Sequence, residues 1–395
     1  MTLIIMMVLV GLVTALLAMG VSEPLIAANL VAGTQAFHLA EAGIERAFGK
    51  IATDNNGFND DLTTGTLFNA VALGAGAYTV TAANNSDGGG ATSDLDDTII
   101  LRSTGTGPNG ATRTLEAIVT TRYDFRDAIV TNDDLELTGN GCVQGTLGGV
   151  HSNGDLTVSG SVVVDQHATA TDKFTLSGNA TVKGLHDGDQ PKHDIPDLKP
   201  GDFAKYATIV LKSDGKATDG NGNSISVPKD WKHSGGKWTC CSGDDGTNGI
   251  YYIEGDVHVS SSPNEPENPW RATLITTGSL DISGNPSIAP ATDPSTGKPF
   301  DIQFLAGTDI SMGGSPNECT NCLAGLIYAR EQFNMNGNVP IRGAVMALDS
   351  GDTSKLVKAG RNKFSGSACV ILNGDLRVRG AMGPLRIISW RMLNS

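Results

Sequence analysis

The chain has 395 residues, enough for two or more domains. It contains 50 glycines but only 5% aromatic residues, a composition that favours many turns and short, narrow strands. The 28 basic and 42 acidic residues give a net charge of −14, which argues against a basic phosphate-binding surface and against nucleic acid as a partner. This acidity suits a solvated, secreted surface.

The first 22 residues carry no charge, and the first ionisable side chain is Glu23. As a helix this stretch would be about 33 Å long, enough to cross the hydrocarbon core of a bilayer. A secretory signal peptide fits less well, because the start has no basic region, the apolar run is too long and no cleavage site follows. Apolar residues then recur every seven positions, which predicts one helix over residues 1–53. This stripe consists of Leu30, Phe37, Ile44 and Ile51.

This design resembles the type IV pilin superfamily. The resemblance is carried by MTLIIMMVLVGLVTALL, by residues 20–24 and by FHLAEAGIERA at 37–47, and the AEAG segment at 40–43 resembles PilX-type pilus assembly proteins. It implies a leader that a prepilin peptidase removes, a methylated first residue, anchoring in the inner membrane before assembly, and the pilus assembly machinery as a partner. No leader is present here, so we expect Met1 to be the mature N-terminus.

The resemblance also points to residues for filament assembly. Most relatives carry a Glu where this chain has Ile5, so assembly here should depend on shape and on Glu23. An unpaired charge at Glu23 would be costly, so we expect it to find a donor on a neighbouring chain or to reach water. Pro24 removes a backbone donor and Gly20 lowers helix propensity, which predicts a break in the helix between them. The expected assembly residues are Met1, Ile5, Gly20, Glu23 and Pro24.

Residues 54–126 are predicted to form a small β-sheet region. Turn-forming residues at 53–57 should end the helix. Short alternating runs predict strands at 77–81, 98–102 and 112–119, in an antiparallel sheet laid on the helix, as in pilin heads.

Residues 127–395 contain an internal repeat, apolar-x-apolar-x-Gly, of which Leu156-Thr-Val158-Ser-Gly160 is an example. Each copy predicts a short strand with two inward side chains and a turn, and stacked copies can bury what one strand cannot. We therefore expect a right-handed parallel β-helix, or β-solenoid, interrupted by an insertion at about 187–270 and ending in a strand at 385–390. The runs GLIYA and GAVMA resemble the β-solenoid domains often fused to PilX-type N-termini. The glycines predicted to end strands are Gly139, Gly160, Gly178, Gly284, Gly314, Gly337 and Gly380.

An even number of cysteines in an extracellular protein is typical of disulfides. The close pairs Cys240-Cys241 and Cys319-x-x-Cys322 could also form a four-thiolate zinc site, and free or mixed thiols are a third alternative. No His follows Cys322, so a c-type haem is not expected. The candidate disulfide residues are Cys142, Cys240, Cys241, Cys319, Cys322 and Cys369.

The sequence offers little evidence for catalytic or metal-binding groups. His38 and Glu41 lie one helical turn apart but are more typical of a solvated surface than of a metal site. The other histidines are scattered, and no Ser-His-Asp or Cys-His motif occurs. A glycan-cleaving site could use the paired aspartates at 133–134, 187–189 and 244–245. Calcium could bind the clustered oxygens at 54–61 and 243–248. Asp is, however, common in such turns because its side chain forms local hydrogen bonds. We expect no enzyme, no cofactor and no resident metal, with calcium as the alternative.

The sequence thus predicts an α+β protein with a long N-terminal helix, a small antiparallel sheet and a β-solenoid head over 127–395. The function expected is that of a structural subunit in an extracellular type IV pilus-like filament, a homo-oligomer on the cell surface that polymerises through its apolar helix. Alternatives are a minor or tip pilin, a type II secretion pseudopilin, or a membrane-anchored β-helix protein for adhesion or glycan binding.

Overall fold

The computed structural model describes residues 2–54, 58–86, 90–94, 96–241, 246–260, 264–265, 268–285, 287–314, 323–358, 361–374, 376, 378 and 382–393. The chain divides into two compact units. The helix–sheet unit comprises Met1–Arg122 together with Pro384–Ser395, and the ladder unit comprises Tyr123–Gly383. The fold is mixed α+β, as predicted, with a long first helix, an antiparallel sheet and large, mostly parallel sheets.

The helix–sheet unit begins with α1 (Thr2–Asp54), a single helix that includes Pro24. The break that we expected near Gly20 is therefore wrong for this structure. Proline removes only one backbone hydrogen bond, and the helix continues on both sides of it. A short helix, α2 (Asn59–Thr64), follows.

A five-stranded sheet packs on the second half of α1. Its order is β1 (Thr66–Leu73), β2 (Gly76–Asn84), β3 (Thr98–Thr106), β4 (Thr112–Arg122) and β33 (Met382–Leu393), with a 3-10 turn, η1 (Pro108–Gly110), between β3 and β4. The three predicted strands correspond to β2, β3 and β4, which pair antiparallel. The prediction missed β1, and it assigned the last strand to the head although β33 lies beside β4.

Small residues let α1 lie close to this sheet. Ala36 and Ala40 are fully buried, and a Cβ on Gly105 of β3 would collide with the backbone of α1 at both of them. The buried face of α1 is thus formed largely by Ala32, Gly33, Ala36, Ala40, Gly43, Ile44, Ala47 and Ile51, whereas Leu30 of the predicted stripe is exposed.

The ladder unit is built from short strands joined by turns. Its first strands are β5 (Ile129–Thr131), β6 (Leu135–Leu137), β7 (Cys142–Gln144), β8 (Val150–Ser152), β9 (Leu156–Val158), β10 (Val163–Val164), β11 (Ala168–Ala170), β12 (Phe174–Leu176), β13 (Thr181–Val182) and β14 (His186–Asp187). A crossover segment, residues 188–208, follows and contains α3 (Pro200–Phe203) and a 3-10 turn, η2 (Ala204–Tyr206).

The chain then continues with further strands. They are β15 (Ile209–Leu211), β16 (Ala217–Asp219), β17 (Ser224–Ile225), β18 (Trp231–Ser234), β19 (Lys237–Cys240), β20 (Gly249–Ile253), β21 (Asp256–Val259), β22 (Asn264–Glu265), β23 (Asn268–Thr276), β24 (Leu280–Ile282), β25 (Ile288–Ala289), β26 (Ile302–Ala306), β27 (Ile310–Gly314), β28 (Ala324–Ala329), β29 (Phe333–Gly337), β30 (Pro340–Ala347), β31 (Asn362–Gly366) and β32 (Cys369–Ile371).

These strands stack in parallel ladders. One ladder is the ten-stranded sheet in the order β12-β9-β6-β31-β29-β27-β24-β21-β19-β18, parallel except for the β18–β19 hairpin. A second ladder runs β14-β11-β8-β5-β30-β28-β26-β23-β20-β15, and a third runs β13-β10-β7-β32-β30. We call three successive strands, one on each ladder, a rung; β5, β6 and β7 form the first rung.

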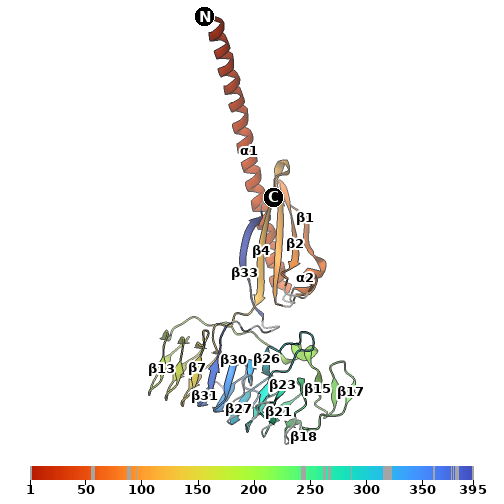
Figure 1. The fold of residues 1–395 in the computed structure, drawn as a ribbon, viewed down its shortest axis with the longest axis vertical. Coiled ribbons are helices and arrows are strands. Elements are labelled where there is room, and N and C mark those ends of the chain that lie inside the picture. The colour runs from red at the N-terminus through yellow and green to blue at the C-terminus, as the bar shows by residue number, and fades with distance from the viewer. Residues whose placement is uncertain are drawn as a thin grey trace. The chain divides into compact units, whose positions relative to one another are not determined.

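The rungs are not stacked in chain order (Figure 1). The first rung is followed outward by β8–β10 and β11–β13, after which the crossover segment carries the chain to the far end. Strands from β15 onward then return, and the last rung, β30 to β32, pairs with the first. The range 187–270, expected to be an insertion, therefore contains the crossover, three antiparallel strand pairings at 209–240 and strands of the ladders themselves.

The repeat motif behaves as predicted in most strands of the ten-stranded sheet but not in β12, where Phe174 is only partly buried and Leu176 is 40% exposed because β12 is the end strand. In β6, β9, β24, β27 and β29, the apolar residues of the motif are buried and the residue between them is partly exposed. The motif glycines that the structure describes have positive φ, and a Cβ on any of them other than Gly284 would strike the backbone of the next glycine in the row. Gly366, which the prediction missed, completes this row between Gly337 and Gly139. Gly380 lies outside the described residues.

Candidate functional site

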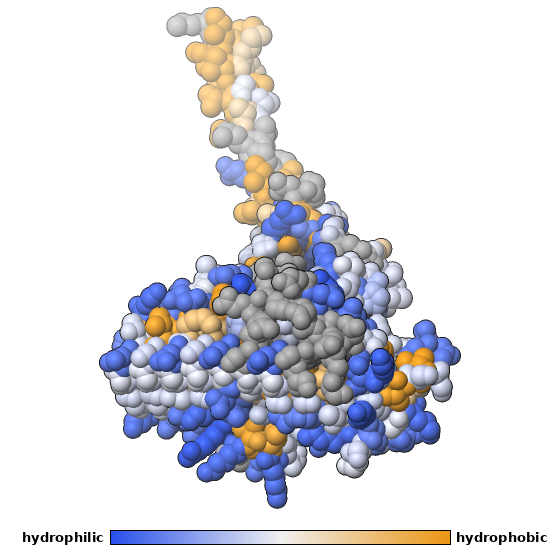
Figure 2. Space-filling view, turned by 60° about the horizontal axis from the view of Figure 1, so that its bottom comes forward, coloured by the Kyte–Doolittle hydropathy of each residue, from blue (hydrophilic) through white to orange (hydrophobic). Residues whose placement is uncertain are grey.

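The first half of α1 is the main exposed apolar surface in the described chain (Figure 2). Ile5 is 55% exposed and Leu3 is 71% exposed. Exposed apolar patches of this kind mark interaction surfaces in soluble proteins. The exposed large residues of this half are Leu3, Ile4, Ile5, Met6, Met7, Val8, Leu9, Val10, Leu12, Val13, Leu16, Leu25, Ile26, Leu30 and Val31.

The predicted assembly residues lie along this half of α1. Ile5 and Glu23 are exposed, and Gly20 and Pro24 lie within the continuous helix. Met1 lies outside the described residues. Within the described chain, no helix combines the length and the apolar character that a membrane span requires.

A disulfide closes the ladder unit. Cys142 of the first rung and Cys369 of the last rung are direct partners in the β7–β32 pair, with Cα atoms 4.5 Å apart, and they form a disulfide. The two residues are 227 positions apart, so the bond fastens the chain's return point to its start. We call this contact between the first and last rungs the joint.

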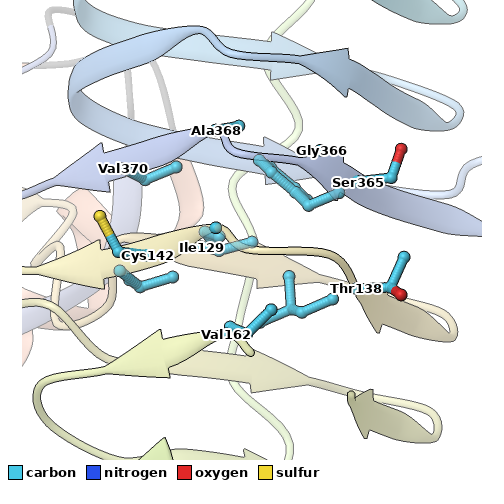
Figure 3. Close-up of a pocket in the computed structure, with 12 residues that line it drawn as sticks. Ile129, Thr138, Cys142, Val162, Ser365, Gly366, Ala368 and Val370 are labelled. Atoms are coloured by element: carbon cyan, nitrogen blue, oxygen red, sulfur yellow. The ribbon is translucent and has the colours of Figure 1, made fainter. Parts of the chain in front are cut away.

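The joint is completed by packing and by polar contacts. A small cavity of about 10 Å³ lies inside it, among side chains that include Ile129, Val162 and Val370 (Figure 3). Asp349 accepts hydrogen bonds from the backbone N–H of Asp133, at 3.0 Å, and from the side chain of Asn362. Burial raises the pKa of Asp349 to about 7.

The other predicted disulfide residues divide into two groups. Cys240 and Cys241 are buried and bonded to one another, which removes both thiolates from the alternative zinc site. Cys319 and Cys322 lie outside the described residues.

Three of the scattered histidines meet around one carboxylate, which the sequence did not predict. His167 donates through Nε2 to one oxygen of the buried Asp127, and His193 donates through Nδ1 to the other at 2.9 Å. The ring of His151 stacks on that of His193 at 3.7 Å, and its two nitrogens contact Thr169 at 2.8 Å and Asn153 at 3.0 Å.

Burial and hydrogen bonding set the pKa values in this cluster. Burial alone would raise the pKa of Asp127, but hydrogen bonds from His167 and His193 outweigh it and lower the pKa to about 2. The hydrogen bond to Asp127 raises the pKa of His167. Burial, with the nearby His193, lowers the pKa of His151 to about 4.

This cluster attaches the crossover segment to the rungs by hydrogen bonds. His193 belongs to the crossover segment, and its backbone exchanges two hydrogen bonds of 2.8 Å with the side chain of Asn153 in the second rung. The four residues come from 127, 151, 167 and 193, and only the topology brings them together, so no local motif could have revealed them. Within the described residues, no group of three or more His, Cys, Asp or Glu side chains is arranged to hold a metal ion.

The remaining candidates show ordinary surface and turn contacts. His38 and Glu41 form an exposed pair at 2.8 Å. Asp133 accepts a hydrogen bond from the adjacent backbone N–H of Asp134, the local role of Asp in turns, whereas Asp134 accepts one from the backbone N–H of Asp155 in the neighbouring rung. The 54–61 segment and the 243–248 segment, both proposed for calcium, lie partly outside the described residues, as do Asp244 and Asp245.

Comparisons with known proteins add little. No family model matches the chain, and no curated protein matches it. A competence-associated pilin from Thermus thermophilus, ComZ, is a structural neighbour that shares 12% sequence identity, with 92% of this chain and 97% of that chain covered. Its TM-score is only 0.31, too low to place this chain in a family.

Proposed function

We propose that this chain is a structural subunit of an extracellular type IV pilus-like filament and that it has no catalytic role. The observation that supports this most is the division of α1. One face of its second half is buried against a sheet, while its first half, in which residues 1–22 are uncharged, presents exposed apolar side chains at 3–16 and 25–31 with no partner in the described residues. Such a surface is a stable arrangement only when lipid or other chains cover it.

In this proposal the first half of α1 anchors the subunit in the inner membrane and then enters the core of the filament. Both surroundings are apolar, so packing and backbone fit determine the geometry of the assembly. Processing by a prepilin peptidase, methylation of the first residue and handling by the pilus assembly machinery belong to the same proposal. The ladder unit serves as a head, which we propose to be a right-handed β-solenoid.

Imaging of filaments sheared from producing cells, with mass spectrometry of their subunits, tests the proposal. We expect this chain to be incorporated in filaments. A major subunit would dominate the sheared protein, whereas a minor pilin, a tip pilin or a pseudopilin would be a trace component. Recovery of the chain only as a monomer in the membrane fraction would contradict the proposal.

Glu23 gives a more specific test of assembly. It is the first ionisable residue after the uncharged stretch, and inside a filament it needs a donor or access to water. Replacing it with Gln removes the charge and keeps the shape. We expect Glu23→Gln to lower the yield of sheared filaments at equal cellular protein level; an unchanged yield would leave Glu23 without an assembly role.

A second candidate function, adhesion to glycans, is favoured by the ten-stranded sheet. The residues that point outward from its neighbouring strands form an in-register row of polar side chains, and its charged members are paired: Glu136 with Lys363 at 3.2 Å, and Asp281 with His258 at 2.8 Å. A continuous row of hydrogen-bonding side chains on an acidic protein suits a neutral polysaccharide. Binding of the full chain to cells or insoluble neutral glycans, lost in Asn334→Lys of the same row, would support this function. The row is Thr175, Thr157, Glu136, Lys363, Asn334, Ser311, Asp281 and His258.

A further inference from the structure

The two ends of the ladder unit are built differently (Figure 1). At one end the ladders finish in antiparallel pairings, β18 with β19 and β16 with both β15 and β17. Trp231 and Trp238 of these strands are almost completely buried, so large aromatic side chains help to cover the core there. At the other end the ladders finish in the rung formed by β12, β13 and β14, which we call the open end.

No further rung covers the open end within the described residues. Its three strands have their ladder partners in the preceding rung, where β12 pairs with β9, β13 with β10 and β14 with β11. After β14 the chain turns back toward that preceding rung, and the backbone N–H of Gln190 donates to the carbonyl of Ala170 at 3.0 Å. The crossover segment therefore starts away from the open end and leaves it uncovered.

The missing rung leaves apolar side chains exposed. Leu176 is in register with Val158 on the neighbouring strand, but Val158 is fully buried and Leu176 is 40% exposed. Leu185 is 59% exposed, and Phe174 and Val182 are only partly buried. Repeat structures normally end in a capping unit with a polar outer face. The open end has no such unit in the described residues, so its apolar side chains need another cover.

The outer edge of β12 also offers backbone groups for pairing. The N–H of Ser177 donates to β9 at 3.0 Å, and the carbonyl of Lys173 accepts from β9 at 2.9 Å. Because the direction of these groups alternates along a strand, the N–H and C=O of Phe174 and Leu176 point away from the ladder. A row of such groups at a sheet edge is a template for a strand of another chain.

We propose that the open end pairs with the open end of a second copy of this chain. A single extended peptide could pair with only one of the three edges. The far end of the ladder unit does not match either, because it finishes in antiparallel pairings instead of a three-stranded rung. The open end of a second copy presents three edges at the same spacing, so it can pair with all of them together.

A two-fold axis through Thr175, perpendicular to β12, satisfies this pairing. It sets β12 antiparallel to β12 of the second copy, so that Phe174 lies opposite Leu176 and apolar side chains cover one another. The same rotation exchanges the other two ladders, so β13 of one copy meets β14 of the other. Such a contact uses the same surface on both copies and is complete after two chains.

The charges of the open end permit self-pairing. The chain as a whole has a net charge of −14, but residues 171–190 carry two lysines and three aspartates, so two open ends repel one another little. One of these lysines, Lys183, already forms an ion pair of 2.8 Å with Asp165 of the preceding rung. Apolar contact and strand pairing therefore meet little electrostatic opposition.

Disulfide trapping tests this contact in full-length chains solubilised in detergent. The backbone groups of Thr175 point toward β9, so Thr175 and its copy form a non-hydrogen-bonded antiparallel pair with Cα atoms about 4.5 Å apart, within the range of a disulfide. Thr175→Cys is therefore oxidised mildly, and the linkage is identified by mass spectrometry. Thr157→Cys is the control one rung inward, about 14 Å from its own copy across three strand spacings. Ser224→Cys is the control at the far end, where Ser224 is exposed on β17.

A second measurement checks the register and does not depend on Thr175. Lys173 and Ser177 lie at equal distances from the axis on opposite sides, so each faces the other across the contact. Chains carrying Lys173→Cys are mixed with chains carrying Ser177→Cys before oxidation. We expect a disulfide between the two variants in the mixture and none between copies of either variant alone.

We expect Thr175→Cys to give about tenfold more crosslinked dimer than either control, and the added substitution Leu176→Lys to remove that excess. Crosslinking at Thr175 no greater than at the controls, with none in the mixture of Lys173→Cys and Ser177→Cys, would overturn the proposed contact. The proposed filament would be unaffected by that result, because chains in detergent are measured without assembly.

Discussion

The two units of this protein treat their apolar residues in opposite ways. In the ladder unit, the inward side chains of each inner rung are covered by the rungs above and below, so Val158, Ile282 and Phe333 are almost completely buried. In the helix–sheet unit, the first half of α1 leaves residues such as Leu9 and Val13 at least half exposed. The ladder unit therefore buries its own apolar side chains, whereas the exposed apolar side chains of α1 can be buried only by lipid or by another chain.

The largest expected effect comes from placing a charge in a rung. Val158 is fully buried, and Val158→Asp would leave an unpaired carboxylate in the apolar core while removing a side chain whose burial contributes roughly 1.5–3 kcal/mol. We expect this variant to lose about 4 kcal/mol or more and to unfold the ladder unit, as followed by thermal melts in circular dichroism.

The neighbouring position is the control for this prediction. Thr157 lies one residue away on the same strand but points outward, and Thr157→Asp should change stability by about 0.5 kcal/mol or less. Equal melting temperatures for the two Asp variants would mean that the rungs do not form the core described above.

The next effect concerns the disulfide at the joint. A crosslink between residues 227 positions apart restricts the unfolded chain strongly, and the chain-entropy argument gives about 5 kcal/mol for the Cys142–Cys369 bond. We expect the double variant Cys142→Ala, Cys369→Ala to unfold at a much lower denaturant concentration. The matched control is Cys240→Ala, Cys241→Ala, because a bond between adjacent residues closes almost no loop. Equal losses of stability in both double variants would show that packing around the joint, and not closure of the long loop, accounts for the stabilisation.

The sequence predicted the rungs but not their order. The alternation in segments such as Leu156–Val158 and the glycine after it follow from local chemistry, so they could be read from the chain. Strand β31 of the last rung was not predicted, because its first inward residue is not apolar. This residue is Asn362, a buried polar residue that donates a hydrogen bond to Asp349. No local sequence pattern indicates that this rung pairs with the first rung.

Two other features of the fold were also not predicted, because the contacts that define them join residues far apart in the sequence. The crossover at 188–208 was read as part of an insertion, because its prolines and its lack of the repeat resemble a loop. β33 was assigned to the head because strand pairing over 260 residues leaves no trace in a single sequence. The uncharged stretch before Glu23, by contrast, is visible directly, which is why the candidate assembly helix was predicted from the sequence.

A smaller effect should appear in the pH dependence of the ladder unit. The pKa of His151 is lowered to about 4 from an ordinary value of 6.5, so the unfolded state binds the proton more tightly. Stability from this residue is complete above pH 6.5 and is lost as the pH falls toward 4, by at most about 3 kcal/mol. Asp349, with a pKa of about 7, and His167, whose pKa Asp127 raises, act in the opposite direction as the pH falls, so the wild-type profile is a sum of these contributions.

The comparison with His151→Gln isolates this contribution. Gln keeps hydrogen-bonding capacity near Thr169 and Asn153 but does not titrate. In urea melts between pH 7 and pH 4, we expect the wild type to lose stability relative to the variant as the pH falls. Parallel profiles for the two proteins would show that His151 does not stay neutral in the folded cluster.

The smallest expected effect on stability is also the one that tests the comparison between the units most directly. Val13 is 50% exposed on α1, and Val13→Asp makes the same chemical change there that Val158→Asp makes in a rung. In detergent-solubilised monomer, the melting temperature should stay within the range of a surface substitution, about 0.5 kcal/mol or less, because no buried contact is lost. The yield of sheared filaments should nevertheless fall sharply, since an apolar environment around the assembled helix would have to accept a carboxylate. A variant that assembles normally would show that the exposed half of α1 is not the surface through which the chain polymerises. A variant that melts early would show that this half is already packed within the single subunit, and the contrast between the two units would then disappear.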